Sequence, residues 1–306
     1  MPFLRAMILG VTGRVGSALA AHLLAADSHG DDETGEGFVQ WGVTGAARCS
    51  DTARAMAVMR LGVDVLTFDA LRDDPALLPD ADVLFLEIWE PRRPELTWPL
   101  NVWGVGRVVE DYARRMGERL IIVNGGTINV YGDRPDAPTE QTPCRPTSEY
   151  GRSRWAQELL IDGVCARYGA RGIHVRYAHA NTATTGVVRR MAEKILAGES
   201  LGGDPDARLQ IIAMEDFVRV TAAATARAAT PPAAVNCCHP RVWTKRELAE
   251  EIQRRLGRGR VCFDVATGGR ERTAIADPSL MISWFGPPQV SLDTVIQRVI
   301  DDLAGH

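Results

Sequence analysis

The segment Leu4-Arg5-Ala6-Met7-Ile8-Leu9-Gly10-Val11-Thr12-Gly13-Arg14-Val15-Gly16 decides how this chain is expected to fold. A short apolar run leads into a turn with glycine at every third position. The residues from Ser17 to Ala26 that follow are rich in alanine and leucine, which is typical of a helix. The order strand, glycine turn, helix predicts the opening of a Rossmann-type α/β sheet.

The glycine turn also predicts a ligand. A helix N-terminus offers free N–H groups to a pyrophosphate, and glycine lets the backbone approach the phosphates closely. We therefore predict a site for NAD or NADP at this turn, and an ordinary glycine-rich strand–helix turn is the alternative. The predicted contacts are Gly10, Thr12, Gly13, Arg14, Val15 and Gly16.

Composition excludes several classes of protein. The chain has 306 residues, 45% of them hydrophobic, and a net charge of −4 with no basic stripe, so nucleic acid is not an expected partner. No apolar run approaches the roughly 20 residues of a membrane span, and no room precedes the first strand for a signal peptide, so we expect a cytoplasmic protein. The six cysteines form no C-x-x-C pair, which argues against a metal site or a disulfide framework.

Strands and helices alternate through the first half of the chain, which predicts a parallel, doubly wound sheet. The expected strands are residues 4–9, 38–44, 64–68, 81–88, 119–124 and 172–177. The expected helices are residues 17–26, 51–61, 102–116 and 150–168, with loops at 27–37 and 133–147.

The alternation changes after about residue 178, which predicts a second lobe. The elements expected there are helices at 187–197, 216–229, 244–256 and 292–303, and strands at 209–213 and 234–238. We expect a cofactor domain at residues 1–178, completed by about 213–239, and a smaller substrate lobe at 179–212 and 240–306.

The region after the second strand bears on the choice between NAD and NADP. NAD sites usually place a carboxylate there to bond the ribose 2′-hydroxyl. The segment from Val43 to Ser50 holds none, and Arg48 with Ser50 could bind a 2′-phosphate. This pattern favours NADP, and the alternative is that Arg48 is an ordinary surface arginine in a chain with 33 arginines and two lysines.

With these elements in view, the chain resembles the extended short-chain dehydrogenase/reductase family, in particular its NAD-dependent epimerase/dehydratase group, nearly end to end. The glycine turn matches that family's cofactor turn, and Tyr150-Gly151-Arg152-Ser153-Arg154 lies where Y-G-x-S-K is expected. The other matching segments are Asp69 after the third strand, Asn101-Val102-Trp103-Gly104, Thr127-Ile128-Asn129-Val130-Tyr131-Gly132, Arg272, Asp277 and Phe285-Gly286-Pro287-Pro288.

The resemblance implies an enzyme and assigns roles by position. Tyr150 would be the acid/base, Thr127 a hydroxyl donor, and Asn101 an organiser of the helix and a water near the site. Arg154 occupies the position of the lysine that stabilises tyrosinate, and a nearby cation lowers a tyrosine pKa.

The resemblance also extends the cofactor contacts. Asp69, followed by Ala70, matches the acidic residue that faces the adenine, and Glu87 and Ile88 follow the fourth strand, beside the cofactor. His179 falls where the family approaches the nicotinamide amide, although a structural histidine is the simpler interpretation.

Three departures from the family pattern stand out. Arginine at 154 keeps the charge but is larger, planar and does not release its proton. Gly125-Gly126 replaces residues that are often serine. Glu87 and Glu90 lie where small residues are common, and we expect them to form a solvated rim rather than extra acid/base groups.

Two hypotheses follow. The first is an NAD(P)-dependent epimerase, dehydratase or reductase acting on a hydroxylated or keto small molecule. The second is a cofactor-binding protein without redox turnover, acting as a sensor, scaffold or subunit, because of Arg154. A homodimer through the helices at 102–116 and 153–168 is a further expectation, although Arg107, Arg114 and Arg115 make that surface charged.

Overall fold

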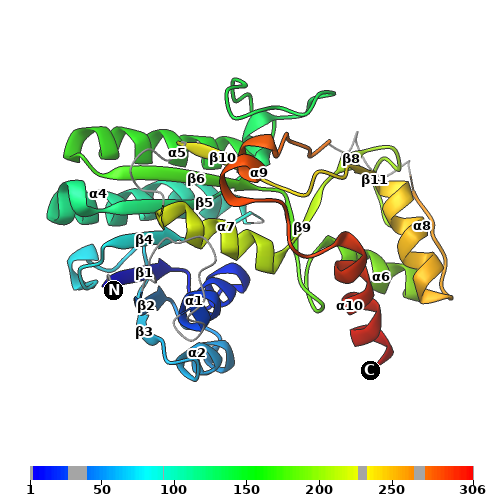
Figure 1. Ribbon diagram of the computed structural model, residues 1–306, viewed down its shortest axis with the longest axis horizontal. Coiled ribbons are helices and arrows are strands. Elements are labelled where there is room, and N and C mark those ends of the chain that lie inside the picture. The colour runs from blue at the N-terminus through cyan, green and yellow to red at the C-terminus, as the bar shows by residue number, and fades with distance from the viewer. Residues whose placement is uncertain (1–2, 27–39, 92, 227–232, 265–272, 306) are drawn as a thin grey trace. The chain divides into compact units, whose positions relative to one another are not determined.

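The computed structural model describes residues 3–26, 40–91, 93–226, 233–264 and 273–305 (Figure 1). The loop predicted at 27–37, the start of the second strand and Arg272 lie outside these residues.

A seven-stranded sheet forms the centre of the fold, in the order β10-β6-β5-β4-β1-β2-β3. The pairs β1–β2, β2–β3, β1–β4 and β4–β5 are parallel, and helices flank the sheet (Figure 1), so the predicted Rossmann-type architecture is confirmed. The order reverses between β1 and β4, and such a reversal is where ligands bind in open α/β sheets. The strands are β1 (Phe3–Leu9), β2 (Gln40–Ala47), β3 (Asp64–Thr67), β4 (Val83–Leu86), β5 (Ile121–Thr127), β6 (Arg171–Tyr177) and β10 (Ala234–Cys237).

Helices join these strands, and local chemistry fixes their ends. Asp51 caps α2 by accepting a hydrogen bond from the Arg54 amide, and Ser148 caps α5 in the same way through the Gly151 amide. Gly169 ends α5 in a left-handed conformation that suits glycine. The helices of this part are α1 (Arg14–Ala26), α2 (Thr52–Met59), α4 (Val105–Met116), α5 (Glu149–Tyr168) and α7 (Met214–Ala226), with a 3₁₀ turn at Pro75–Leu77.

The predicted helix at 102–116 begins differently from the expectation. A short helix, α3 (Pro94–Trp98), leads into a π-helical segment over Pro99–Gly104, and regular α-helix starts only at Val105. Pro99 has no N–H to donate and restricts the residue before it, so the chain cannot run as one regular helix through this point.

The strand predicted at 209–213 is divided at Gln210. β8 (Arg208–Leu209) pairs with β11 (Trp243–Thr244), and β9 (Ile211–Ala213) pairs with β7 (His179–Asn181). The buried Gln210 side chain donates to the His239 carbonyl and accepts from the Ala276 amide. It thus satisfies backbone groups of two other segments at the point where the strand changes its partner.

Contacts between Cα atoms divide the chain into two compact units, which we describe separately. The first contains residues 1–126, 148–175 and 218–234, and the second contains 127–147, 176–217 and 235–306. The domain boundaries expected from the sequence remain a prediction.

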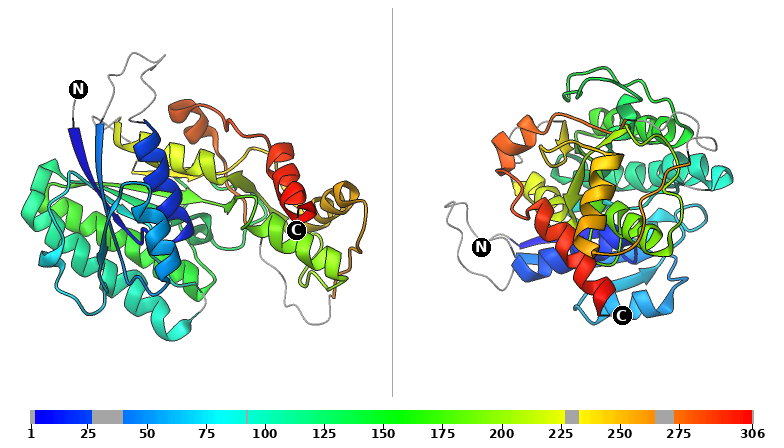
Figure 2. Two further views of the ribbon diagram at one scale, coloured as in Figure 1. Left: turned by 90° about the horizontal axis from the view of Figure 1, so that it is seen from below. Right: turned by 90° about the vertical axis from the view of Figure 1, so that its right-hand side faces the viewer.

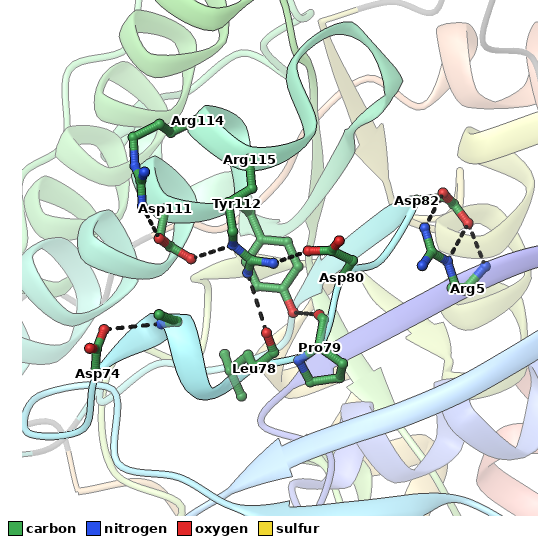
Figure 3. A network of polar contacts seen from close by, with 11 residues as sticks. Arg5, Asp74, Leu78, Pro79, Asp80, Asp82, Asp111, Tyr112, Arg114 and Arg115 are labelled. Atoms are coloured by element: carbon green, nitrogen blue, oxygen red, sulfur yellow. Dashed lines mark hydrogen bonds and ion pairs between the residues drawn. The ribbon is translucent and has the colours of Figure 1, made fainter.

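In the first unit, α4 packs on α5 over one apolar core. Tyr112 of α4 is fully buried, and its hydroxyl donates to the Pro79 carbonyl over 2.7 Å (Figure 3). The neighbouring Arg115 binds Asp111, Asp80 and the Leu78 carbonyl. The positive charge of Arg115 is therefore balanced within the unit.

In the second unit, three helices share a second core: α6 (Val187–Ala197), α8 (Lys245–Leu256) and α10 (Leu292–Ala304). Figure 2 shows the red α10 beside the golden α8. A capping box starts α8, because Thr244 and Glu247 each bond the other's backbone amide. A helix that the sequence analysis did not predict, α9, covers Ser279–Phe285.

No helix within the described ranges is long and apolar enough to span a membrane.

Candidate functional site

The glycine turn lies at the carboxyl end of β1, between β2 and β4. The Gly10 amide donates to Ala46 of β2 over 2.7 Å, and the Glu87 amide after β4 donates to Leu9 over 2.9 Å. Helix α1 then begins at Arg14, so its first-turn N–H groups have no partner within the helix. The turn thus brings helix-end donors to the point where the strand order reverses.

Packing requires glycine at two of the three positions. Gly10 has φ +91°, and a Cβ there would lie 2.4 Å from the Glu87 carbonyl oxygen. A Cβ on Gly16 would lie 2.4 Å from the Gly10 carbonyl oxygen. A Cβ on Gly13 would meet its nearest neighbour at 3.0 Å, so glycine there is less strictly demanded by the turn itself. A dinucleotide pyrophosphate fits this turn, because the close approach it needs is the one that glycine provides.

The other residues of the turn divide by exposure. Val15 is buried and could offer only its backbone, Thr12 is half-buried, and Arg14 is exposed. The Rossmann turn predicted from the sequence is therefore present, and its contacts with a cofactor remain a prediction.

Arg48 and Ser50 are exposed and follow the carboxyl end of β2. Cys49 between them has φ +50°, an uncommon conformation for a residue other than glycine. The first carboxylate after them, Asp51, accepts the Arg54 amide as the cap of α2. The end of β2 therefore presents a cation and a hydroxyl.

Asp69 shapes the turn after β3. Its carboxylate accepts the Leu71 amide over 3.0 Å, and its own amide donates to Asp73 over 2.7 Å. Ala70 beside it is buried, and its carbonyl accepts from Arg107 over 3.2 Å. Contact of Asp69 and Ala70 with an adenine remains a prediction.

Glu87 is not part of a solvated rim, and this expectation was wrong. Its side chain is buried, and within the described residues neither carboxylate oxygen has a hydrogen-bond partner. Burial raises the pKa of Glu87 to about 8, opposed by the positive charge of Arg154. Glu90 lies nearer the surface and pairs with Arg93 over 2.6 Å. Ile88 is half-buried between them.

Asn101 joins three segments of the first unit. Its Oδ1 accepts the Glu90 amide over 2.8 Å, and its Nδ2 donates to the Glu90 carbonyl over 3.3 Å and to the Ser153 hydroxyl over 3.0 Å. That hydroxyl in turn donates to the Tyr150 carbonyl over 2.8 Å. Asn101 therefore holds the π-helical segment to the first turn of α5, and its role in the site remains a prediction.

Tyr150 and Arg154 lie one turn apart on α5, as the sequence predicts. Tyr150 is half-buried, whereas Arg154 is fully buried. The Arg154 guanidinium donates to the Gly125 and Ile88 carbonyls and to Asn124, and it lies 5.5 Å from the ring centroid of Trp89. Protein groups thus hold the guanidinium, and with it the positive charge of Arg154, in a fixed position.

Thr127 and His179 belong to the second unit. Thr127 is the last residue of β5, is buried, and accepts the Asn129 amide over 3.2 Å, which starts the turn Ile128–Tyr131. His179 begins β7, and burial, together with the positive charges of Arg190 and Lys245, lowers its pKa to about 4. His179 is therefore neutral near pH 7.

A cavity of about 350 Å³ in the second unit is a feature that the sequence analysis missed. Its lining includes both lysines of the chain, Lys194 and Lys245, with Arg190, Arg208 and His179, and among the described residues no acidic side chain lines it. The remaining lining is apolar: Val187, Met191, Leu201, Ala207, Leu209 and Ala274. Such a lining suits an anion that carries some apolar surface. No local sequence pattern indicates this cavity, because the two lysines lie far apart along the chain. The one sequence signal that could have pointed to it is that these are the only lysines in the sequence.

Among the residues that the structure describes, no group of three or more His, Cys, Asp or Glu side chains could hold a metal ion. All six cysteines are free thiols. Of the C-terminal matches, Asp277 accepts the Ser279 amide and hydroxyl at the start of α9.

Known proteins resemble this chain in sequence and in structure. The model of the NAD dependent epimerase/dehydratase family matches residues 6–238. A UDP-glucose 4-epimerase of Streptomyces lividans is 30% identical over 192 residues, which cover 59% of this chain and 54% of that protein. The chain thus matches about half the length of that relative.

Solved structures share the fold. A UDP-glucuronic acid 4-epimerase from Bacillus cereus in complex with NAD superposes with a TM-score of 0.81 at 18% identity, covering 98% of this chain and 99% of that one. A dTDP-glucose 4,6-dehydratase from Bacillus anthracis in complex with NAD gives 0.82 at 16% identity, covering 99% and 97%. Because the family model spans most of the residues and includes the glycine turn and α5, the chain belongs to the NAD dependent epimerase/dehydratase family.

Proposed function

We propose that this protein is an NAD(P)-dependent enzyme of the epimerase type, whose substrate is an anionic, hydroxylated small molecule such as a nucleotide-diphosphate sugar. The observation that carries the proposal is the arrangement on α5, where Tyr150 lies one turn from a buried, fixed Arg154. Family membership supplies the cofactor class.

Tyr150 would act as the acid/base. The phenol of a free tyrosine has a pKa of about 10, too high for a base at neutral pH. A buried guanidinium on the same helix face stabilises the phenolate, because the low-polarity surroundings screen its charge weakly. Tyr150 would then remove a proton from a substrate hydroxyl. Thr127, at the end of β5, would be the hydroxyl donor.

The cofactor would be held by the backbone of the glycine turn, and the bound nicotinamide supplies a hydride acceptor and donor for the substrate carbon. Arg48 and Ser50 support a 2′-phosphate, hence NADP, because the end of β2 presents a cation and a hydroxyl where a carboxylate would serve NAD.

The cationic cavity in the second unit supports an anionic substrate. Two lysines and two arginines line it, and the neutral His179 can donate or accept a hydrogen bond. A diphosphate would match this charge, and the apolar lining would match a base. The epimerases that resemble this chain are named for nucleotide sugars, which agrees with this assignment.

A direct test is to incubate the protein with NAD or NADP and UDP-glucose, and to follow the C4 epimer by proton NMR. We expect product from the wild type and a loss of at least about 100-fold in Tyr150→Phe, the scale of general acid–base catalysis. Tyr168→Phe is the matched control, since that hydroxyl, on the same helix, contacts the exposed Glu110. Equal rates in Tyr150→Phe and the wild type would refute the mechanism.

One observation favours the second hypothesis, a cofactor-binding protein without turnover. Arg154 is fully buried, and protein groups bond its guanidinium, so it is poorly placed to act as a mobile lysine would. Arg154→Lys separates the two hypotheses. A large gain in rate would indicate a disabled enzyme, and a loss would indicate a site built around arginine.

A further inference from the structure

Four side chains of the first unit form a continuous hydrogen-bonded series that begins at Arg154. Nη2 of Arg154 donates to Oδ1 of Asn124 over 3.3 Å. Nδ2 of Asn124 lies 3.2 Å from Nδ1 of His174, and Nε2 of His174 lies 3.0 Å from Oδ1 of Asp162. The series thus connects the proposed site with the surface carboxylate of Asp162.

The direction of every bond in the series follows from its first member. A guanidinium can only donate, so Asn124 must accept with its oxygen and present its amide nitrogen to His174. That nitrogen can only donate, so Nδ1 of His174 is an acceptor and carries no proton. The ring proton is therefore on Nε2, from which it is donated to Asp162. One tautomer of His174 satisfies all three links.

Burial makes this arrangement unusual. Arg154 and Asn124 are fully buried and His174 is 2% exposed, whereas the Asp162 side chain is 51% exposed. Asn124 on β5 and His174 on β6 each follow apolar residues, in IIVN and GIH. Polar groups in such a core cost free energy unless they are paired. Two apolar side chains would suffice for packing alone, so the polar pair points to a task beyond packing.

We propose that Asn124, His174 and Asp162 are positioning residues, which hold the Arg154 guanidinium in the orientation that the site requires. This rests on the proposed function, in which Arg154 supplies positive charge near Tyr150. The guanidinium is planar and its donors form a rigid fork, so one further acceptor fixes how the plane is turned. An ammonium group is a compact point charge with rotating donors and would gain little from the same series.

The series orients Arg154 and does not conduct protons. Arginine keeps its proton under all ordinary conditions, so no proton can leave the site through it. The carboxylate of Asp162 lies at the opposite end of the series from the guanidinium. Asn124 and His174 each turn an acceptor atom toward the positive charge of Arg154 and an N–H group toward the negative charge of Asp162. Such alignment strengthens the individual hydrogen bonds.

The test is a double-mutant cycle on turnover. Asn124→Leu removes one of the three acceptors of Arg154 and keeps the branching of the side chain, and Asp162→Ala removes the far end of the series at a half-exposed position. We expect Asn124→Leu to lower kcat about tenfold, the scale of one lost bond to a charged group, with little change in KM. In an Arg154→Lys background the same substitution should leave kcat almost unchanged.

Two comparisons keep the proposal falsifiable. Asp162→Asn retains an acceptor oxygen and should recover most of the kcat that Asp162→Ala loses, whereas Asp64→Ala, on the exposed edge strand β3, should change nothing. Equal losses of kcat from Asn124→Leu in the wild-type and Arg154→Lys backgrounds would show damage to packing only and would overturn the proposal.

A spectroscopic measurement needs no substrate. The ¹⁵N shifts of the His174 ring at neutral pH should show the neutral form with its proton on Nε2. A proton on Nδ1, or a charged ring, would overturn the series itself. Because this measurement is independent of turnover, a wild type without activity would count against the proposed function alone.

Discussion

The carboxylate of Glu87 occupies the space that a side chain at Gly125 would need. A Cβ on Gly125 would lie 2.3 Å from Oε2 of Glu87 and 2.7 Å from Oε1. Glu87 directly follows β4, and Gly125 lies near the end of the neighbouring strand, β5. Two departures from the family pattern, an acid at 87 and a glycine at 125, are thus one packing arrangement.

This relationship predicts a compensating pair of substitutions. Gly125→Ala should lower the free energy of unfolding by about 1–3 kcal/mol, since overpacking displaces the carboxylate. Glu87→Ala together with Gly125→Ala should be more stable than Gly125→Ala alone. Urea unfolding checks both, with Gly163→Ala on α5 as the control, because nothing lies within 4 Å of a Cβ there among the described residues. Additive effects of the two substitutions would contradict the arrangement.

The raised pKa of Glu87 predicts how stability depends on pH. An unfolded glutamate has a pKa near 4.5, and burial raises the pKa of Glu87 to about 8. Between these values the folded protein binds a proton that the unfolded chain releases, so this group's contribution to stability falls as pH rises. Glu87→Gln should remove that fall. Urea unfolding at about pH 5.5 and about pH 9 should show the variant gaining on the wild type at the higher pH, and parallel profiles would be evidence against a buried acid.

The buried hydroxyl of Tyr112 predicts that removing it lowers the stability of the first unit. Its hydroxyl bonds the Pro79 carbonyl in a fully buried position, so Tyr112→Phe leaves that carbonyl without this donor. We expect a loss of about 1 kcal/mol in the free energy of unfolding. Tyr168→Phe, whose hydroxyl bond lies at an exposed position, should cost less. Thermal or urea unfolding measures the difference, and equal losses would argue against the buried bond.

The cationic cavity predicts charge-dependent binding of substrate. Lys194→Ala and Lys245→Ala should each raise KM for a nucleotide-diphosphate sugar several-fold, with a smaller change in kcat, because each removes binding energy present in ground and transition states alike. The effect should shrink at high salt, since ions screen the attraction. Arg246→Ala, next to Lys245 but outside the lining, is the control. An unchanged KM in both lysine variants would show that the cavity does not bind the substrate.

The end of β2 predicts cofactor preference. Arg48→Ala should weaken NADPH binding about tenfold and leave NADH binding nearly unchanged, because only NADPH carries the 2′-phosphate. Arg54→Ala, on the exposed first turn of α2, is the comparison. An equal loss of affinity for both cofactors would show that Arg48 does not contact the 2′-phosphate of the ribose.

Much of the fold could be predicted from sequence because its signals are local. The period of apolar residues predicted α6 with the bounds that the structure shows, Val187–Ala197, and the glycine spacing located the turn at the reversal of strand order. The spacing of Tyr150 and Arg154 likewise placed both on one helix, α5.

The features that sequence could not supply depend on contacts between distant segments. A glutamate in isolation is expected to be solvated, and Glu87 is buried only because Gly125 on the next strand leaves room for it. The series from Arg154 to Asp162 joins residues on α5, β5 and β6. Lys194 and Lys245 meet because α6 packs on α8. No periodic pattern of residues in the sequence predicts such contacts between distant segments.

The most direct test of the account is a fluorescence titration of the purified protein, freed of any bound nucleotide, with NADH and with NADPH. We expect saturable binding of at least one, with NADPH the tighter of the two. Binding of neither would contradict the central claim, that the turn from Gly10 to Gly16 is a working cofactor site, and the roles proposed for Thr127, Tyr150 and Arg154 would then fall with it.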